Sequence, residues 1–127
     1  MAEALSPSWT QRARAGHDLA SFADVSEAAN ALMGLLLDVE DTAVTRQTAE
    51  ALTRVGSVPA IRLIALALAK ADDNRADWLQ IGVHDALVGP GSAPDVAAAC
   101  GKLTQDPEEA VRRGASDILV WAEGPRR

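Results

Sequence analysis

Residues 37–70 read LDVEDTAVTRQTAEALTRVGSVPAIRLIALALAK, and this segment contains the unit that the rest of the chain repeats. A polar loop precedes a first helical stretch, and Gly56 suits the left-handed residue that often ends a helix. Ser57 and Pro59 then begin a second, more apolar helical stretch. The segment therefore predicts two helices joined by a tight turn.

Three other parts of the chain match the first helix of this unit. The four aligned stretches are QRARAGHDL (11–19), VTRQTAEAL (44–52), LQIGVHDAL (79–87) and VRRGASDIL (111–119). We call helices of this kind odd helices, and the second helix of each pair an even helix. The even helices share inward apolar positions at i, i+3, i+4 and i+7, which is the spacing of one helix face. Those positions are Ala28, Ala31, Leu32 and Leu35 in the first copy, Ile61, Ile64, Ala65 and Leu68 in the second, and Val96, Ala99, Cys100 and Leu103 in the third.

A period that is present in both helices predicts a repeat architecture. We expect one all-α domain over 1–127, a short right-handed α-solenoid of about seven helices in three pairs plus a closing helix. The repeats are expected at about 8–37, 42–71, 75–103 and 107–122, with 1–6 and 124–127 disordered. Trp9 and Trp121 are placed to shield the two open ends, and Trp78 to fill a gap between repeats.

The composition favours closely packed helices. The 127 residues include 26 alanines but one phenylalanine and no tyrosine, and small side chains let helices approach closely. The net charge of −6, from 18 acidic and 12 basic residues, argues against nucleic acids and anionic membranes as partners. A lone cysteine, and an N-terminus without the features of a secretory signal, favour the cytoplasm.

The helix-pair pattern resembles the HEAT-like repeats. It is clearest in LLLDVEDTAVTRQTAEALTRVGSVPAIRLIALAL and in LTQDPEEAVRRGASDIL, where a loop Asp is followed by Val, Arg and an Ala- and Leu-rich core. The resemblance spans about residues 8–122, and it implies an architecture more than a function because the shared residues are structural. The repeats are shorter than the usual unit of ~40–47 residues and look more like the short variety of bilin-lyase-type proteins.

Two His-Asp pairs, His17-Asp18 and His84-Asp85, are the best candidates for chemistry. They fall in helices two repeats apart, about 20 Å at ~10 Å per packed helix layer, which is too far to share one metal ion. Cys100 falls in an inward position and is expected to be a buried, inert thiol. We therefore predict no metal, no cofactor and no catalytic residues.

The outward positions of the even helices predict a different kind of site. Apolar side chains fall together there, with basic residues at the margin, and this pattern is typical of a groove for a helix or an extended peptide. The candidate partner-binding residues are Asn30, Met33, Arg62, Leu63, Leu66 and Lys102. The alternative is that strong curvature of the solenoid buries the apolar ones against neighbouring even helices.

These patterns favour a non-enzymatic interaction module or scaffold. It is expected to bind a protein segment, or a second copy of itself as a homodimer, through the concave even-helix face. An acidic immunity or antitoxin-type inhibitor of a basic toxin is the alternative, suggested by size and charge. A bilin-lyase-like protein or a metal-dependent HEAT enzyme is a further alternative. Neither nucleic acid nor membrane is expected as a partner.

Overall fold

The computed structural model describes residues 2–89 and 91–123, and these form an all-helical protein without strands. The seven α-helices are α1 (Trp9–Leu19), α2 (Ser26–Leu36), α3 (Thr42–Val55), α4 (Val58–Lys70), α5 (Asp73–Leu87), α6 (Ser92–Leu103) and α7 (Glu109–Glu123). Two short 3₁₀ helices, η1 (Ala2–Leu5) and η2 (Ala20–Phe22), precede and follow α1. The predicted all-α class and the seven helices are confirmed.

Polar residues in the loops set the starts of the central helices. The side chains of Asp41, Ser57 and Asp72 each accept a hydrogen bond from a backbone N–H in the first turn of α3, α4 and α5 respectively. Such caps satisfy donors that a helix end leaves unpaired. Gly56 ends α3 with a φ of 67°, the left-handed conformation predicted from the sequence.

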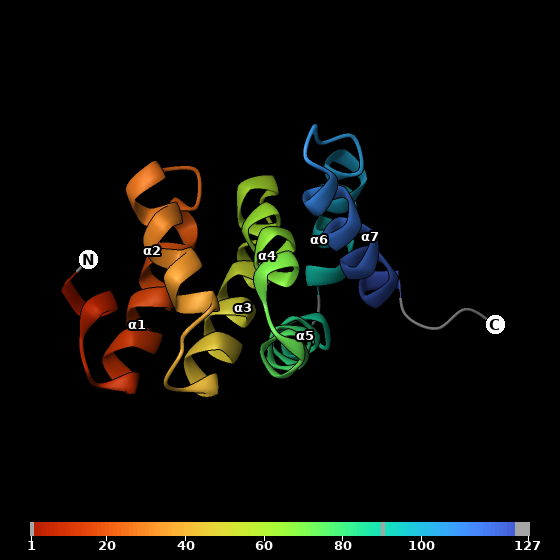
Figure 1. Cartoon of the computed structure of the whole chain (residues 1–127). Coiled ribbons are helices and arrows are strands. Elements are labelled where there is room, and N and C mark those ends of the chain that lie inside the picture. Colours follow the sequence, from red (N-terminus) through yellow and green to blue (C-terminus); the bar gives the residue numbers. More distant parts are fainter. Residues whose placement is uncertain (1, 90, 124–127) are drawn as a thin grey trace.

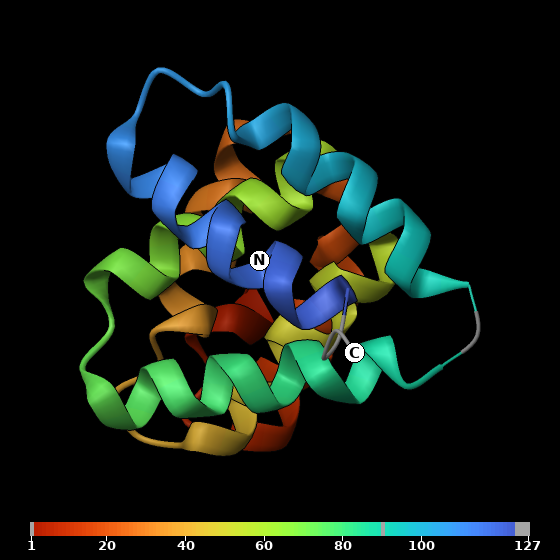
Figure 2. The same cartoon turned by 90° about the vertical axis from the view of Figure 1, so that its right-hand side faces the viewer.

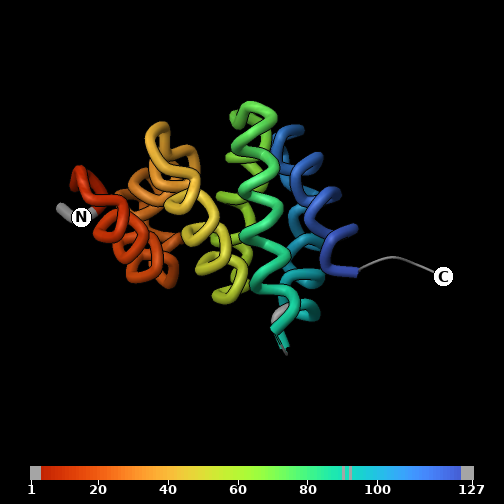
Figure 3. Tube along the Cα trace, turned by 90° about the horizontal axis from the view of Figure 1, so that it is seen from below, coloured from red at the N-terminus to blue at the C-terminus, as the bar shows by residue number. Residues whose placement is uncertain are grey.

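The helices lie in successive layers along the molecule (Figure 1). Seen from below, α1, α3 and α5 lie side by side on one surface (Figure 3), which we call the odd-helix face. The layer at the C-terminal end differs from the earlier two, because α7 runs between α5 and α6 (Figure 2). The closing helix therefore packs mainly against α6 and α4, and less against α5.

Two glycines in aligned positions of α5 and α7 let these helices approach their neighbours closely. A Cβ on Gly82 would lie 2.9 Å from the Cβ of Ala49 in α3. A Cβ on Gly114 would lie 2.6–2.7 Å from atoms of Ala65 in α4. Side chains do not tolerate such distances, so glycine at these positions determines how near α5 and α7 can lie to the central layer.

The core follows the predicted inward face of the even helices. Ten of the twelve positions named above are buried, and the other two, Ala31 and Leu68, are half-buried. Ile61, Ile64 and Ala65 of α4 are 0% exposed, which places α4 at the centre of the core. Periodicity thus identified the correct face of each even helix.

The leader, which we expected to be disordered, contains η1. Ala4 of this helix packs against Ala15 of α1 and Leu35 of α2, so η1 covers part of the N-terminal end of the stack. The other segment expected to be disordered, 124–127, lies outside the described residues.

Candidate functional site

The apolar residues predicted to form a groove on the even helices lie against the core. Leu63 is 8% exposed and belongs to the main core cluster. Met33 and Leu66 are half-buried and pack against the same cluster. α4 contacts α2, α3, α5, α6 and α7, so an outward position in the middle of the stack has neighbours that the end helices lack. Burial by neighbouring helices, the alternative raised above, therefore applies at Leu63.

The polar residues of the predicted site lie in three separate environments. Asn30 is exposed and lines a cavity of about 310 Å³ at the N-terminal end of the stack. Lys102 is exposed beside a cavity of about 300 Å³ between the α3–α4 turn and α6. Arg62 is bound to the carboxylates of Asp106 at 3.0 Å and Glu108 at 3.1 Å. The structure does not bring these residues together around one cavity.

A larger groove lies on the odd-helix face, between α1 and α3, with a volume of about 460 Å³. We call it the Trp9 groove. Its lining residues are Trp9, Thr10, Ala13, Arg14, His17, Gln47, Glu50, Ala51 and Arg54. The side chains of Ala13 and Ala51 are buried and leave room for a guest side chain. Trp9 is 43% exposed, so it does not close the end of the stack as we expected.

A second hollow of about 390 Å³ adjoins the Trp9 groove and shares Gln47 and Glu50 with it. Trp78 of α5 lines this hollow and is half-buried. The third tryptophan, Trp121, packs against the core near the end of α7, with its ring centroid 5.8 Å from that of His84. Two of the three tryptophans thus line hollows on the odd-helix face.

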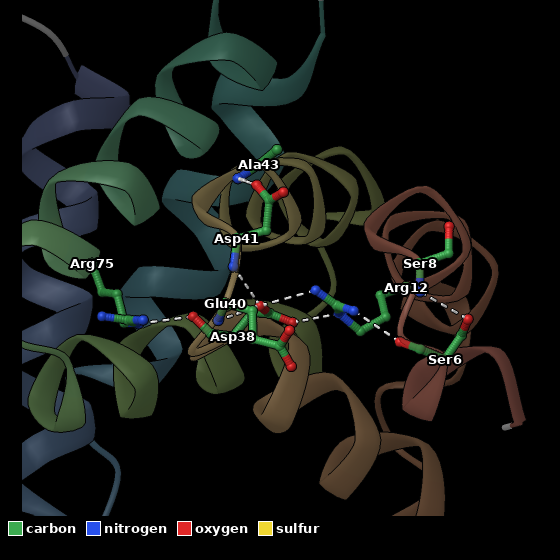
Figure 4. A network of polar contacts seen from close by, with 8 residues as sticks. All are labelled: Ser6, Ser8, Arg12, Asp38, Glu40, Asp41, Ala43 and Arg75. Atoms are coloured by element: carbon green, nitrogen blue, oxygen red, sulfur yellow. Dashed lines mark hydrogen bonds and ion pairs between the residues drawn. The ribbon is translucent and has the colours of Figure 1, made fainter.

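A buried polar network positions the start of α1, where Trp9 is located (Figure 4). Arg12 donates from Nε to the Asp38 carboxylate at 2.7 Å and from a terminal nitrogen to the carbonyl oxygen of Ser6 at 2.8 Å. The backbone N–H of Ser8 donates to the Ser6 hydroxyl at 3.1 Å. Trp9 follows directly, so the network fixes the backbone that carries the indole.

Asp38 joins three parts of the chain. Besides Arg12, its carboxylate accepts the backbone N–H groups of Glu40 and Asp41 at 2.9 and 2.8 Å, and its carbonyl accepts Nε of Arg75 in α5 at 2.8 Å. Burial by itself would raise the pKa of Asp38, but the hydrogen bonds from Asp41, Arg12 and Glu40 outweigh it and hold the pKa below its usual value. The carboxylate therefore stays charged in a buried position.

The charged groups of the Trp9 groove are suited to binding. Arg54 donates to one oxygen of Glu50 from Nε at 3.2 Å and from a terminal nitrogen at 2.7 Å, and their side chains are 52% and 30% exposed. The hydroxyl of Thr10 is hydrogen-bonded to that of Ser8 at 2.8 Å. The groove thus offers a partly exposed ion pair, hydrogen-bonding hydroxyls and an aromatic face.

Groups that could support metal or thiol chemistry are scattered over the described residues. Within the described residues, no cluster of three or more His, Cys, Asp or Glu side chains could hold a metal ion. His17 lines the Trp9 groove, whereas His84 lies near Trp121 at the other end. Burial raises the pKa of the Cys100 thiol to about 11, which keeps it protonated. None of the described helices is both long and apolar enough to cross a bilayer.

The Trp9 groove was not predicted from the sequence, because the predicted binding residues were the outward positions of the even helices. Trp9, Ala13 and His17 are spaced at i, i+4 and i+8, which places them on one face of α1. Gln47, Ala51 and Arg54 are spaced at i, i+4 and i+7, which places them on one face of α3. This spacing was visible in the sequence, but the pairing of the two faces required the packing of α1 against α3.

Comparisons of the chain with protein-family models, with curated proteins and with solved structures found no match.

Proposed function

We propose that this protein is a non-enzymatic interaction module that binds a segment of another protein. The observation that carries this proposal is the Trp9 groove, where a 43% exposed tryptophan borders a hollow of about 460 Å³ with buried alanines in its lining. Tryptophan and arginine are the side chains that most often dominate the affinity of protein interfaces. Small-molecule sites enclose most of the surface of their ligand, so an open groove is better suited to a side chain of a bound peptide.

The proposed framework for this module is a stack of helix pairs of the HEAT-like kind. It is supported by three loop aspartates at equal intervals of 34 residues, Asp38, Asp72 and Asp106. Each precedes an odd helix and accepts a hydrogen bond from a backbone N–H of the next few residues. A spacing that recurs in both sequence and hydrogen bonding is what repeated helix pairs would produce.

The even-helix face is a second location for the same function. Met33 and Leu66 are half-buried there, so part of each side chain is accessible to a partner. Leu66→Asp tests this location, since an aspartate at the buried Leu63 would damage the core as well as the surface.

The proposal is tested by selecting from a random peptide library displayed on phage, with the full chain immobilised. Trp9→Ala and Leu66→Asp are tested in parallel, after circular dichroism has shown that each variant keeps its helical content. We expect enriched peptides to bind the wild type and Leu66→Asp but not Trp9→Ala. Peptides that lose binding with Leu66→Asp instead would place the site on the even helices. A selection that enriches no peptide would contradict the proposed function.

A further inference from the structure

The Trp9 groove and the second hollow adjoin each other across α3. The second hollow, which we call the Trp78 hollow, is lined by α3 and by Trp78 of α5, whereas the Trp9 groove lies between α1 and α3. α3 lies between α1 and α5 on the odd-helix face (Figure 3), so the two hollows are on opposite sides of this helix. Gln47 and Glu50 line both hollows and form the ridge between them. One segment of a partner can therefore occupy both hollows by crossing α3 at this ridge.

The arginines around the two hollows already have interactions within the chain. Arg54 donates to Glu50 at 2.7 Å, and Arg46 donates to Asp85 at 2.6 Å. Arg14 also has an interaction of its own. A charged side chain of a ligand would compete with these contacts, so the hollows complement uncharged side chains. The tryptophan in each hollow favours large apolar or aromatic ones.

The ridge offers hydrogen bonds to the backbone of a ligand. The side-chain amide of Gln47 is exposed and has no hydrogen-bond partner among the described residues. Both bonds from Arg54 end on one oxygen of Glu50, so the other carboxylate oxygen can accept a further N–H group. An extended segment presents free backbone N–H and C=O groups, whereas a helix pairs most of its own internally. The ridge therefore favours an extended segment.

The positions of the two hollows along α3 determine the spacing of the side chains that fill them. The axes of packed helices lie about 8–10 Å apart, so hollows on opposite sides of α3 are about that far apart across the helix. The Trp9 groove meets α3 between residues 47 and 54, and the Trp78 hollow meets it between residues 41 and 50. Their centres are thus also offset by about five residues, or ~8 Å, along the helix. The two offsets combine to about 12 Å, which an extended chain covers in roughly four residues.

We infer that the partner of this module is an extended protein segment with two large, uncharged apolar or aromatic side chains three to five residues apart. One side chain fills the Trp9 groove and the other fills the Trp78 hollow, while Gln47 and Glu50 bind the backbone between them. This inference rests on the proposed function, because it describes the segment that the module binds.

The test uses synthetic, fluorophore-labelled versions of the peptides enriched by the selection above. Their affinity for the full chain is measured by fluorescence polarisation, and each residue of a peptide is replaced by alanine in turn. We expect two apolar positions, three to five residues apart, where alanine weakens binding about tenfold or more, since burial of a large apolar side chain contributes about that factor. Raising the salt concentration is expected to change the affinity less than about threefold, because the ligand is not held by charge.

Trp78→Ala has a matched control on the same helix. Ile81 of α5 is also apolar and is 37% exposed, but it lines neither hollow. Trp78→Ala is expected to weaken binding about tenfold, and Ile81→Ala to leave it unchanged. In Trp78→Ala, alanine at one of the two peptide positions should lose most of its effect while alanine at the other keeps it, which assigns each side chain to its hollow.

A second variant changes the Trp78 hollow without removing the indole. Ala43 lines this hollow in the first turn of α3, where a negative charge stabilises the helix, so Ala43→Glu is expected to keep the fold. Its longer, charged side chain occupies the hollow and is expected to weaken binding as Trp78→Ala does. Circular dichroism checks that both variants keep their helical content.

The outcomes separate the inference from the proposed function. Peptides that need Trp9 but have a single apolar position, or that bind Trp78→Ala and Ala43→Glu as tightly as the wild type, would overturn the inference alone. Apolar positions seven or eight residues apart would also overturn it, because that spacing places two side chains on one face of a helical segment. A strong loss of affinity at high salt would overturn it and favour an inhibitor of a basic toxin. A selection that enriches no peptide overturns the proposed function and the inference together.

Discussion

Replacing Asp38 by alanine is the sharpest test of how the N-terminal layer is held. The substitution removes the acceptor of Arg12 Nε at 2.7 Å and of the Glu40 and Asp41 N–H groups at 2.9 and 2.8 Å. The side chains of Arg12 and Asp38 are 7% and 9% exposed, so water does not readily replace the lost partner. A buried guanidinium group is left without its counter-charge.

The expected cost follows from this burial. Removing one member of a buried ion pair costs about 3–5 kcal/mol, because the remaining charge loses its partner away from water. A domain of this size has a free energy of unfolding of roughly 5–15 kcal/mol, so Asp38→Ala would remove a large part of it. Arg113→Ala is the control, since Arg113 and Glu109 are 78% and 64% exposed and such pairs contribute about 0.3–0.5 kcal/mol.

The assay is urea unfolding at neutral pH, followed by circular dichroism at a helical wavelength. The double variant Arg12→Met/Asp38→Ala is expected to recover part of the loss, because it removes the unpaired charge as well. The reasoning would be refuted if Asp38→Ala lowered the free energy of unfolding by less than about 1 kcal/mol, the range of an exposed pair. A double variant less stable than both single variants would refute it too.

The same carboxylate makes stability depend on pH. The pKa of Asp38 in the folded protein lies below its usual value of 3.8, which the unfolded chain keeps. At pH values between these two pKa values the unfolded chain binds more protons than the folded one. The contribution is fully present above about pH 4 and is lost as the pH falls through the lowered pKa. Hydrogen bonds from Arg62 and the Glu108 N–H lower the pKa of Asp106 in the same direction. In urea unfolding from pH 7 to pH 3, the free energy of unfolding of Asp38→Asn is therefore expected to fall less steeply at acid pH than that of the wild type.

Three further predictions concern helix contacts, buried hydroxyls and the thiol. Gly114→Ala would force a Cβ to 2.6–2.7 Å from Ala65 and should lower the free energy of unfolding by about 1–3 kcal/mol in urea. Gly34→Ala, with nothing within 4 Å of its Cβ, should raise it by about 0.5–1 kcal/mol. Thr45→Val should leave the free energy of unfolding unchanged or increase it, since the buried hydroxyl has no hydrogen-bond partner within the described residues. A decrease of more than about 1 kcal/mol would show that the hydroxyl does have a hydrogen-bond partner. Cys100, with a pKa of about 11, should react with a thiol reagent at pH 8 much more slowly in the folded protein than in urea, and equal rates would contradict its burial.

The inward faces of the helices could be predicted because they depend on neighbours along the chain. A helix brings residues three and four apart onto one side, so Ala28, Ile61 and Val96 were assigned to the core from spacing alone. They are 3%, 0% and 0% exposed. The turn at Gly56 was equally local, since the left-handed conformation favours glycine.

The outward faces could not be predicted in the same way. Asn30, Leu63 and Ala98 occupy equivalent positions, yet Asn30 and Ala98 are exposed while Leu63 is 8% exposed. α4 contacts α2, α3, α5, α6 and α7, which places it in the middle of the structure, and its Leu63 belongs to the main core cluster. Local periodicity does not show which helix lies in the middle of the structure. An exposed outward face and a buried outward face of an even helix therefore have the same sequence pattern.

An alanine-rich core explains why polar contacts are found inside this small domain. Alanine side chains give helix surfaces shallow ridges, which hold two helices in register weakly. The Arg12–Asp38 pair at the start of α1 supplies a directional contact, and the close approaches at Gly82 and Gly114 add steric restraints. A single buried polar residue is known to fix the register of coiled coils at a cost in stability.

Register matters here because the two walls of the Trp9 groove belong to different helices. A slip of α1 by one helical turn would move Trp9 about 5.4 Å relative to Ala51 and Arg54 on α3. The two walls of the groove would then no longer present their side chains in the same arrangement. In the proposed function the network around Asp38 would thus link stability to binding, since it holds the first turn of α1, and Trp9 there lines the same groove as Arg54.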